Sequence, residues 1–191
     1  YGLMSDLSIN DKMFCGYNDF CLANCYMIGF NKDMVAEYSG TIGNLYDQVR
    51  NKQWTLEKMI EYSSLVSQDN GDGKWDENDT YGFSCFAWVP LVSFQHAANI
   101  PIVKEGTDGE FYISPMVDNS EKIIALDEML YDFMKAEYTY TYSPFDGKQA
   151  LPLKSGRVMF EIVNNYGLVS TKEEDVKVGV LPYPLWDSNQ E

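Results

Sequence analysis

The sequence has very little histidine, little positive charge and no long apolar run. Its 191 residues contain a single His and 14 Lys and Arg against 29 Asp and Glu, which gives a formal net charge of -15. Catalytic triads and zinc sites built on His are therefore nearly excluded. Nucleic acids and anionic lipid surfaces attract clustered Lys and Arg, so neither is expected as a partner. No apolar stretch approaches the ~18 residues of a transmembrane helix, so we expect no membrane span in this chain.

Cysteine is also scarce, and the usual enzyme signatures are missing. The four cysteines are too few for a disulfide scaffold of this length and fit no zinc-site spacing. Cys21 and Cys25 can pair with each other or with Cys15, and a buried free thiol is the alternative; Cys85 stands apart. The sequence contains no GxSxG, no P-loop, no GxGxxG after a strand and no HExxH. Its many carboxylates single out no catalytic pair.

The pattern of the remaining residues predicts one α/β domain over residues 1–191. Strands and helices alternate along the chain, which favours a central sheet with helices around it. Thr55 is placed to cap a helix whose apolar residues recur at helical spacing. Strands are expected at 22–30, 81–86, 157–163 and 177–181, helices at 31–38, 42–51, 120–137 and 148–154, and a hairpin around 108–109.

Aromatic residues are plentiful at 15%, and some of them follow predicted strands. Trp88 comes after the strand 81–86, and Asn164, Asn165 and Tyr166 come after the strand 157–163. In α/β sheets, ligands bind beyond the carboxyl ends of the strands. Trp and Tyr stack on the faces of sugars, and amides recognise hydroxyl groups. These residues are candidate ligand contacts; the equally weighted alternative is a core Trp88 and a simple turn at Asn164 and Asn165.

The acidic loop from Gln68 to Asp79 resembles a calcium-binding loop. Gly73 stands at position 6, where the backbone turns sharply, and oxygen ligands recur at alternate positions. Position 1 is Gln68 rather than Asp, and the loop leads into a strand rather than a second helix, so a solvated acidic turn is the alternative. The candidate Ca²⁺ ligands are Asn70, Asp72, the Lys74 carbonyl, Asp76 and Asp79.

Several segments together resemble the extracellular solute-binding proteins of ABC transporters, especially the sugar-binding branch. These segments are the Trp-Thr pair at Trp54, the acidic loop, Tyr81-Gly-Phe, the segment Gly29-Phe-Asn-Lys-Asp, the strand entry at Ser155-Gly-Arg-Val-Met-Phe, and Gly179-Val-Leu-Pro-Tyr-Pro. Their order and spacing extend over nearly the whole chain. The resemblance implies a periplasmic-binding-protein-like α/β fold of type II, with a central mixed sheet flanked by helices.

Members of that family have two lobes joined by hinges, with the ligand between them. The resemblance implies that this chain is the second, C-terminal lobe. The chain starts at Tyr1 without a signal peptide, which independently suggests a piece of a longer protein. The resemblance also implies export, a lipid anchor outside this chain (or a periplasmic location), a first lobe, an ABC permease and a carbohydrate ligand. Tyr17 and Asn18, near the hinge, are further candidate contacts.

The sequence therefore predicts a lobe that captures a sugar or oligosaccharide without catalysis and without a required cofactor. Two other classes of function remain open. A secreted glycoside hydrolase domain would suit the acidity and the aromatic content, and a calcium-dependent surface interaction module would suit the acidic loop.

Overall fold

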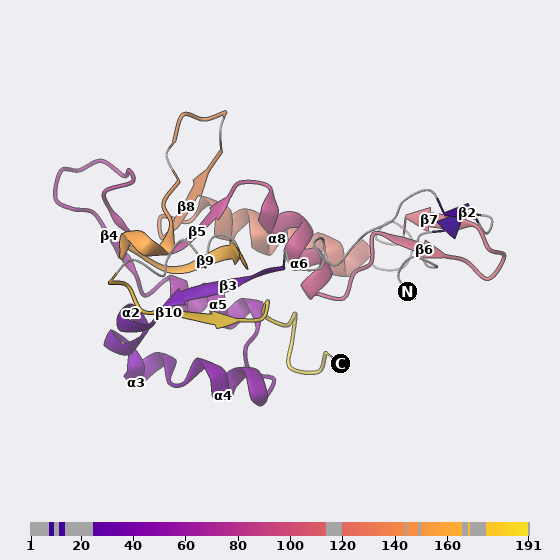
Figure 1. Cartoon of the computed structure of the whole chain (residues 1–191), viewed down its shortest axis with the longest axis horizontal. Helices are drawn as coiled ribbons and strands as arrows, with labels where there is room; N and C mark the ends of the chain where they lie inside the picture. Colours follow the sequence, from indigo (N-terminus) through magenta and orange to yellow (C-terminus); the bar gives the residue numbers. More distant parts are fainter. Residues whose placement is uncertain are drawn as a thin grey trace.

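A mixed β-sheet forms the centre of the molecule in the computed structural model (Figure 1). The structure describes residues 8–9, 12–13, 25–113, 120–143, 145–148, 150–165, 168 and 175–190. The sheet has the order β10–β3–β9–β5, and β4 and β8 both pair with the remaining edge of β5. Its strands are β3 (Tyr26–Asn31), β4 (Ser67–Gln68), β5 (Thr80–Phe86), β8 (Thr139–Tyr142), β9 (Val158–Asn164) and β10 (Val178–Leu181).

The directions of the strands bring several strand ends to one edge of the sheet. β5 is parallel to both β8 and β9, whereas β3 is antiparallel to β9. The last residues of β5 and β8, Phe86 and Tyr142, are therefore register partners, and the first residue of β3, Tyr26, is opposite Asn164 at the end of β9. We call this edge the carboxyl edge.

Side-chain caps fix where two of the helices begin. The Oδ1 atom of Asn31 accepts hydrogen bonds from the backbone N–H groups of Asp33 and Met34, and the Oγ1 atom of Thr55 accepts one from Lys58. The cap predicted at Thr55 is thus confirmed. The helices are α2 (Lys32–Glu37), α3 (Ser39–Ile42), α4 (Leu45–Arg50), α5 (Leu56–Ser63), α6 (Val89–Ala97) and α8 (Ser120–Lys135), with the 3-10 helix η2 (Leu153–Ser155).

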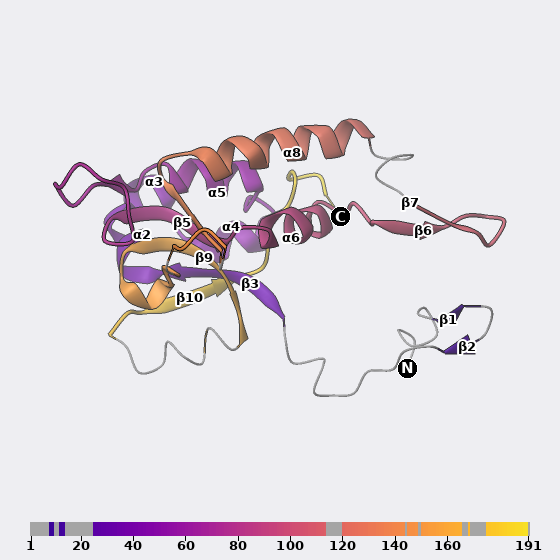
Figure 2. The same ribbon diagram turned by 90° about the horizontal axis from the view of Figure 1, so that it is seen from above.

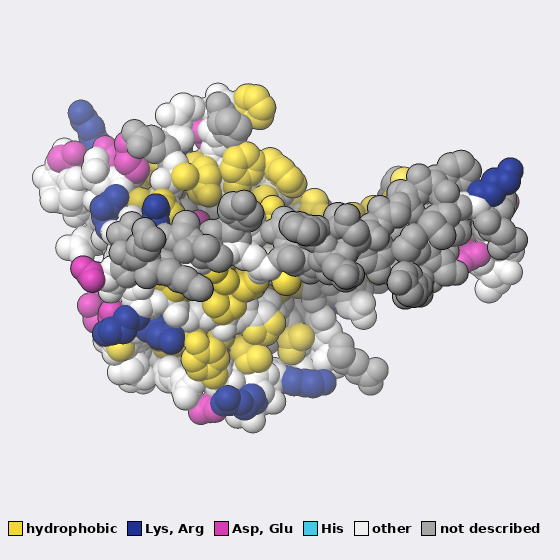
Figure 3. Space-filling view, viewed as in Figure 1, with side chains coloured by type: hydrophobic (Ala, Val, Ile, Leu, Met, Phe, Trp, Pro, Cys, Tyr) yellow, Lys and Arg dark blue, Asp and Glu magenta, His cyan; other side chains and the backbone are white. Residues whose placement is uncertain are grey.

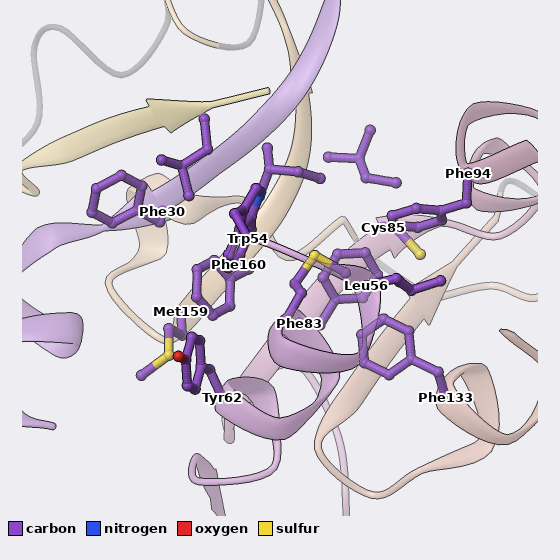
Figure 4. Packing of buried hydrophobic residues seen from close by; sticks show 14 of the residues in the cluster. Phe30, Trp54, Leu56, Tyr62, Phe83, Cys85, Phe94, Phe133, Met159 and Phe160 are labelled. Carbon is purple, nitrogen blue, oxygen red and sulfur yellow. The ribbon is translucent and has the colours of Figure 1, made fainter. Parts of the chain in front are cut away.

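The main hydrophobic core lies between the sheet and the helices. Figure 2 shows α5 and α8 on the same side of the sheet. Trp54 and Phe160 pack with ring centroids 5.7 Å apart, and Phe83 packs on Phe133 at 4.8 Å (Figure 4). The Trp54 indole N–H donates to the Pro182 carbonyl, so its polar atom is satisfied inside the core.

The opposite face of the sheet is covered by the segment 151–155. Three residues that lie in one row across the sheet hold this segment in place. They are Glu161 and its two register partners, Gly29 and Ser84. The Ser84 hydroxyl donates to the Leu151 carbonyl at 2.8 Å, and the Leu153 N–H donates to Oε2 of Glu161 at 2.7 Å. Gly29 leaves room for Leu153, since a Cβ there would be 2.5 Å from the Leu153 Cδ1 atom.

Two hairpins complete the described structure. β1 (Ser8–Ile9) pairs with β2 (Lys12–Met13), and β6 (Val103–Glu105) pairs with β7 (Phe111–Ile113), which confirms the hairpin expected around 108–109. Figures 1 and 2 both show β6 and β7 extending away from the sheet. No helix in the described ranges combines the length and the apolar character that a membrane span requires.

Three expected elements differ from the structure. The helix expected at 42–51 is split, because Gly43 has a φ of 69° and Asn44 caps a new helix. The helix expected at 148–154 is only the single 3-10 turn η2, and the strand expected at 22–30 begins at Tyr26. Two further elements, α6 and β8, were not expected from the sequence.

Candidate ligand-binding site

A pocket of about 370 Å³ opens at the carboxyl edge of the sheet. Residues from the ends of β5, β8 and β9, from the start of β3 and from the turn before α6 line it together. The lining includes four aromatic residues and two polar ones: Tyr26, Phe86, Trp88, Tyr142, Glu161 and Asn164. The position of the pocket follows from the strand directions, because strand ends leave backbone and side chains free to face a ligand.

The aromatic residues form a wall of rings set at right angles to each other. Phe86 packs edge-to-face on Trp88 and on Tyr142, each with centroids 5.7 Å apart and an interplanar angle of 89°. Trp88 is 61% exposed although it is a large apolar side chain. Its position in the turn between β5 and α6, just before Pro90 in the first helical turn, keeps it at the rim. A rigid, exposed indole at a pocket rim offers a flat surface for stacking.

Apolar side chains gather on the molecular face around this region. Figure 3 shows them over the ends of β5 and β8. Tyr26, which is 46% exposed, contributes to the exposed aromatic surface at the start of β3. An exposed apolar surface bordered by polar groups is typical of a binding site.

Glu161 is the buried acidic residue of the pocket. It is 8% exposed, and its burial raises the pKa of the carboxyl to about 7, although the hydrogen bond from the Leu153 N–H opposes this rise. A carboxyl with this pKa changes its charge near neutral pH. Burial, and then the charge of Glu161, raise the pKa of the Tyr142 phenol to about 12, so this phenol is neutral at pH 7 and can both donate and accept.

The structure brings two of the predicted contacts into this pocket. Both line it, Trp88 from the turn between β5 and α6 and Asn164 from the end of β9. Asn165 follows directly after Asn164 and is partly buried, but it is not part of the lining. Tyr17, Asn18 and Tyr166 lie outside the described residues. Contact between these residues and a ligand stays a prediction.

Among the aromatic and polar lining residues, sequence reasoning missed Tyr26, Tyr142 and Glu161, whereas Phe86 belongs to the segment Phe86-Ala-Trp88 that the sequence places after the strand 81–86. A signal was present for one of them, because Glu161 is a single acidic residue within the otherwise apolar run 158–163. Tyr142 had no such signal, since its strand is only four residues long and was not predicted.

The acidic loop predicted to bind Ca²⁺ is folded by its own side chains. The Asp79 carboxylate is buried and accepts the N–H groups of Asn70 at 2.8 Å and Asp76 at 2.7 Å. Asn70 and Asp72 each accept an N–H two residues ahead, from Asp72 and Lys74. Among the described residues, no three His, Cys, Asp or Glu side chains converge as a metal site would require. Calcium binding by this loop therefore stays a prediction.

The cysteines that the structure describes are free thiols. Cys25 is exposed and Cys85 is buried, where desolvation raises the pKa of its thiol. Cys15 and Cys21 lie outside the described residues. Cys25 is thus a free thiol, as in the alternative to pairing, but it is exposed rather than buried, and a pairing of Cys21 with Cys15 stays a prediction.

Two other hollows lie among the helices, away from the carboxyl edge. One of about 260 Å³ is lined mainly by apolar atoms of α2, α4 and Phe30. The other, of about 420 Å³, lies at the start of α5 beside Gln48, Gln53 and Tyr62. Neither combines several aromatic faces with an amide and a carboxyl group, as the pocket at the carboxyl edge does.

The fold is similar to that of solved sugar-binding proteins. A cyclo/maltodextrin-binding protein complexed with maltotetraose superposes with a TM-score of 0.59 and 17% identity, over 95% of this chain and 41% of that chain. The maltose/maltodextrin-binding domain MalE from Bdellovibrio bacteriovorus bound to maltotriose gives 0.56 and 14%, over 86% of this chain and 38% of that one. A Thermus thermophilus maltotriose binding protein bound with maltotriose gives 0.53 and 14%, over 85% and 38%.

These similarities establish the fold. The chain has the mixed α/β architecture of periplasmic-binding-protein-like solute-binding proteins, as the sequence predicted. It spans about two fifths of the length of these proteins. No protein-family model matches the chain, and no curated protein matches it.

Proposed function

We propose that this chain is the second lobe of an extracellular solute-binding protein that captures a sugar or oligosaccharide for an ABC importer. The observation that supports this most strongly is the pocket at the carboxyl edge, with an exposed Trp88, further aromatic rings and the Asn164 amide. This combination suits a ligand with apolar ring faces and many hydroxyl groups. The structural neighbours are sugar-binding proteins, and the chain covers 41% of the first of them, which is consistent with one lobe of two.

The proposed mechanism is capture by closure. A first lobe, joined by hinges, supplies the other half of the cleft, and the closed, liganded form is the one that the permease selects. The whole protein is held outside the cell membrane, or in the periplasm, by a lipid anchor elsewhere in its sequence. A pocket of about 370 Å³ on one lobe buries only part of an oligosaccharide, so the lobe alone should bind weakly.

The pocket favours capture over hydrolysis. Glycoside hydrolysis by the common mechanism uses two carboxyl groups on either side of the scissile bond. Among the described residues that line the pocket, Glu161 is the only one with a carboxyl group. The loop from Gln68 to Asp79, which suggested a calcium-dependent module, packs at the opposite end of β5, where Thr80 begins the strand.

The chain offers a matched pair of tryptophans for the test. Trp88 is 61% exposed in the pocket, and Trp75 is 45% exposed on the acidic loop. Calorimetric titration with maltotriose and maltotetraose should show that Trp88→Ala lowers the affinity about fivefold or more, since stacking on an aromatic ring is worth about 1 kcal/mol or more. Trp75→Ala should change it by less than about twofold. Equal effects of the two substitutions would contradict the proposed site.

A further inference from the structure

The pocket contains a buried carboxyl group to which the described residues offer no positive partner. Glu161 is 8% exposed, and the hydrogen bond that the described residues give it is the one from the Leu153 N–H to Oε2. None of the described lining residues is Lys, Arg or His. A buried carboxylate is costly unless it is paired or protonated, so in the empty pocket a proton takes the place of a cation.

The groups around Glu161 do not supply that cation. On β8, Tyr142 contributes a phenol, and on β5, Cys85 contributes a thiol; both are neutral near pH 7 because burial raises their pKa values. From the covering segment, η2 contributes the Leu153 N–H, while Lys154 is exposed. No described residue forms an ion pair with Glu161.

The rest of the pocket also favours a positive ligand. The faces of Trp88, Phe86 and Tyr142 carry negative charge from their π electrons and attract cations. The chain carries a formal net charge of -15, which raises the local concentration of cations and lowers that of anions.

We infer that the sugar bound here carries a positively charged amino group, and that Glu161 is its counter-ion in the wall of the pocket. This inference rests on the proposed sugar-binding function and names the class of sugar. In the complex, the ammonium donates to the Glu161 carboxylate, and the sugar ring packs against the aromatic wall. Any proton on Glu161 leaves to solvent when the ammonium binds, so that the ionised carboxylate faces the ammonium.

The test compares three sugars that differ at one position. Glucosamine, N-acetylglucosamine and glucose carry an ammonium, an acetamido group and a hydroxyl at the same carbon, and their β-1,4-linked trimers extend the series. We expect glucosamine or its trimer to bind at least tenfold more tightly than the two neutral members at pH 7, by calorimetry on the protein with whatever flanking sequence its gene encodes.

Glu161→Gln removes the negative charge at this position and keeps a side chain of nearly the same size. The amide oxygen can still accept from the Leu153 N–H, so the covering segment keeps its hydrogen bond. In this variant the ratio of the affinity for glucosamine to the affinity for glucose should fall to about one. Glu128→Gln, at an exposed position of α8, is the matched control and should keep the preference.

The possible outcomes distinguish the inference that the ligand is an amino sugar from the proposed sugar-binding function. Equal affinity for the three sugars in the unmodified protein would overturn the inference about Glu161 and leave sugar capture standing, and this comparison needs no variant to fold. A preference for glucosamine that persists in Glu161→Gln would place the cation elsewhere and also overturn it. Failure of these sugars and of maltotriose and maltotetraose to bind would refute the proposed function itself.

Discussion

At the scale of single residues, burial decides which side chains have unusual chemistry. Glu161 is an isolated acid in the apolar strand Val158–Asn164, and its position could be seen in the sequence. The environment of Glu161 could not be predicted from the sequence, because it is built from separate parts of the chain. Gly29 and Ser84 are its register partners on β3 and β5, and Leu153 lies in the covering segment. The sequence identified Trp88 and Asn164 as candidates, but only the fold shows that they share a pocket.

The raised pKa of Glu161 predicts that alkaline conditions destabilise the fold. The pKa is about 7 in the folded state against an ordinary pKa of 4.5 for a solvent-exposed Glu, so the folded state holds the proton more tightly. The stability from this proton is fully present below about pH 4.5 and is lost as the pH rises through about 7. Relative to the unmodified chain, Glu161→Gln should therefore gain stability between pH 5 and pH 8, by on the order of 3 kcal/mol.

Urea unfolding at a series of pH values measures this gain. Glu128→Gln, on the exposed face of α8, controls for the general effect of removing one negative charge. If the difference in unfolding free energy between Glu161→Gln and the unmodified chain stayed constant from pH 5 to pH 8, the carboxyl would not be buried as the structure describes.

At the scale of elements, the strands and helices whose apolar residues recur at a clear spacing were predicted well. The strands expected at 81–86 and 157–163 occupy Thr80–Phe86 and Val158–Asn164, and the helix expected at 120–137 is α8, Ser120–Lys135. The helix α6, Val89–Ala97, was missed because its apolar residues surround the helix instead of following one face. The strand β8 was missed because four residues form a strand only when a neighbour such as β5 pairs with them.

The contact between α5 and β5 depends on a glycine. A Cβ at Gly82 would collide with the backbone carbonyl of Ser63, and backbone atoms cannot rotate away as a flexible side chain can. We expect Gly82→Ala to lower the free energy of unfolding by at least about 2 kcal/mol. Gly40→Ala in α3 is the matched control, since a Cβ there meets nothing within 4 Å. A similar stability for the two variants in chemical denaturation would show that α5 does not approach β5 so closely.

The acidic loop before β5 is held mainly by Asp79. Its carboxylate is 1% exposed and accepts two backbone N–H groups, from Asn70 and Asp76. Asp79→Ala leaves both N–H donors without a partner. We therefore expect this substitution to lower the free energy of unfolding by about 2 kcal/mol or more in the presence of EDTA. Asp72→Ala, at an exposed position, should lose less than about 1 kcal/mol. A reversed order of these two losses in thermal unfolding would argue against this loop geometry.

The calcium prediction is tested at the same loop. Ca²⁺ at millimolar concentration should raise the melting temperature of the unmodified chain by a few degrees relative to EDTA, because a ligand that binds only the folded state stabilises it. Asp72→Ala removes one predicted ligand and should abolish this rise. Identical melting temperatures of the unmodified chain in Ca²⁺ and in EDTA would count against a metal site between Gln68 and Asp79.

At the scale of the whole molecule, the chain matches only part of the length of the proteins that share its fold. The chain spans 41% of the cyclo/maltodextrin-binding protein that it resembles in fold. The sequence predicted this fold from the order of short segments such as Gly29-Phe-Asn-Lys-Asp and Gly179-Val-Leu-Pro-Tyr-Pro. These segments turn out to lie in β3 and β10, which are neighbours in the sheet, with Gly179 opposite Phe30.

The most direct test of sugar capture is a thermal-shift screen of the protein, with the flanking sequence that its gene encodes, against a library of carbohydrates and a library of short peptides. The account predicts that at least one sugar raises the melting temperature and that Trp88→Ala, but not Trp75→Ala, greatly reduces this rise. A rise with peptides and none with any sugar would contradict the account.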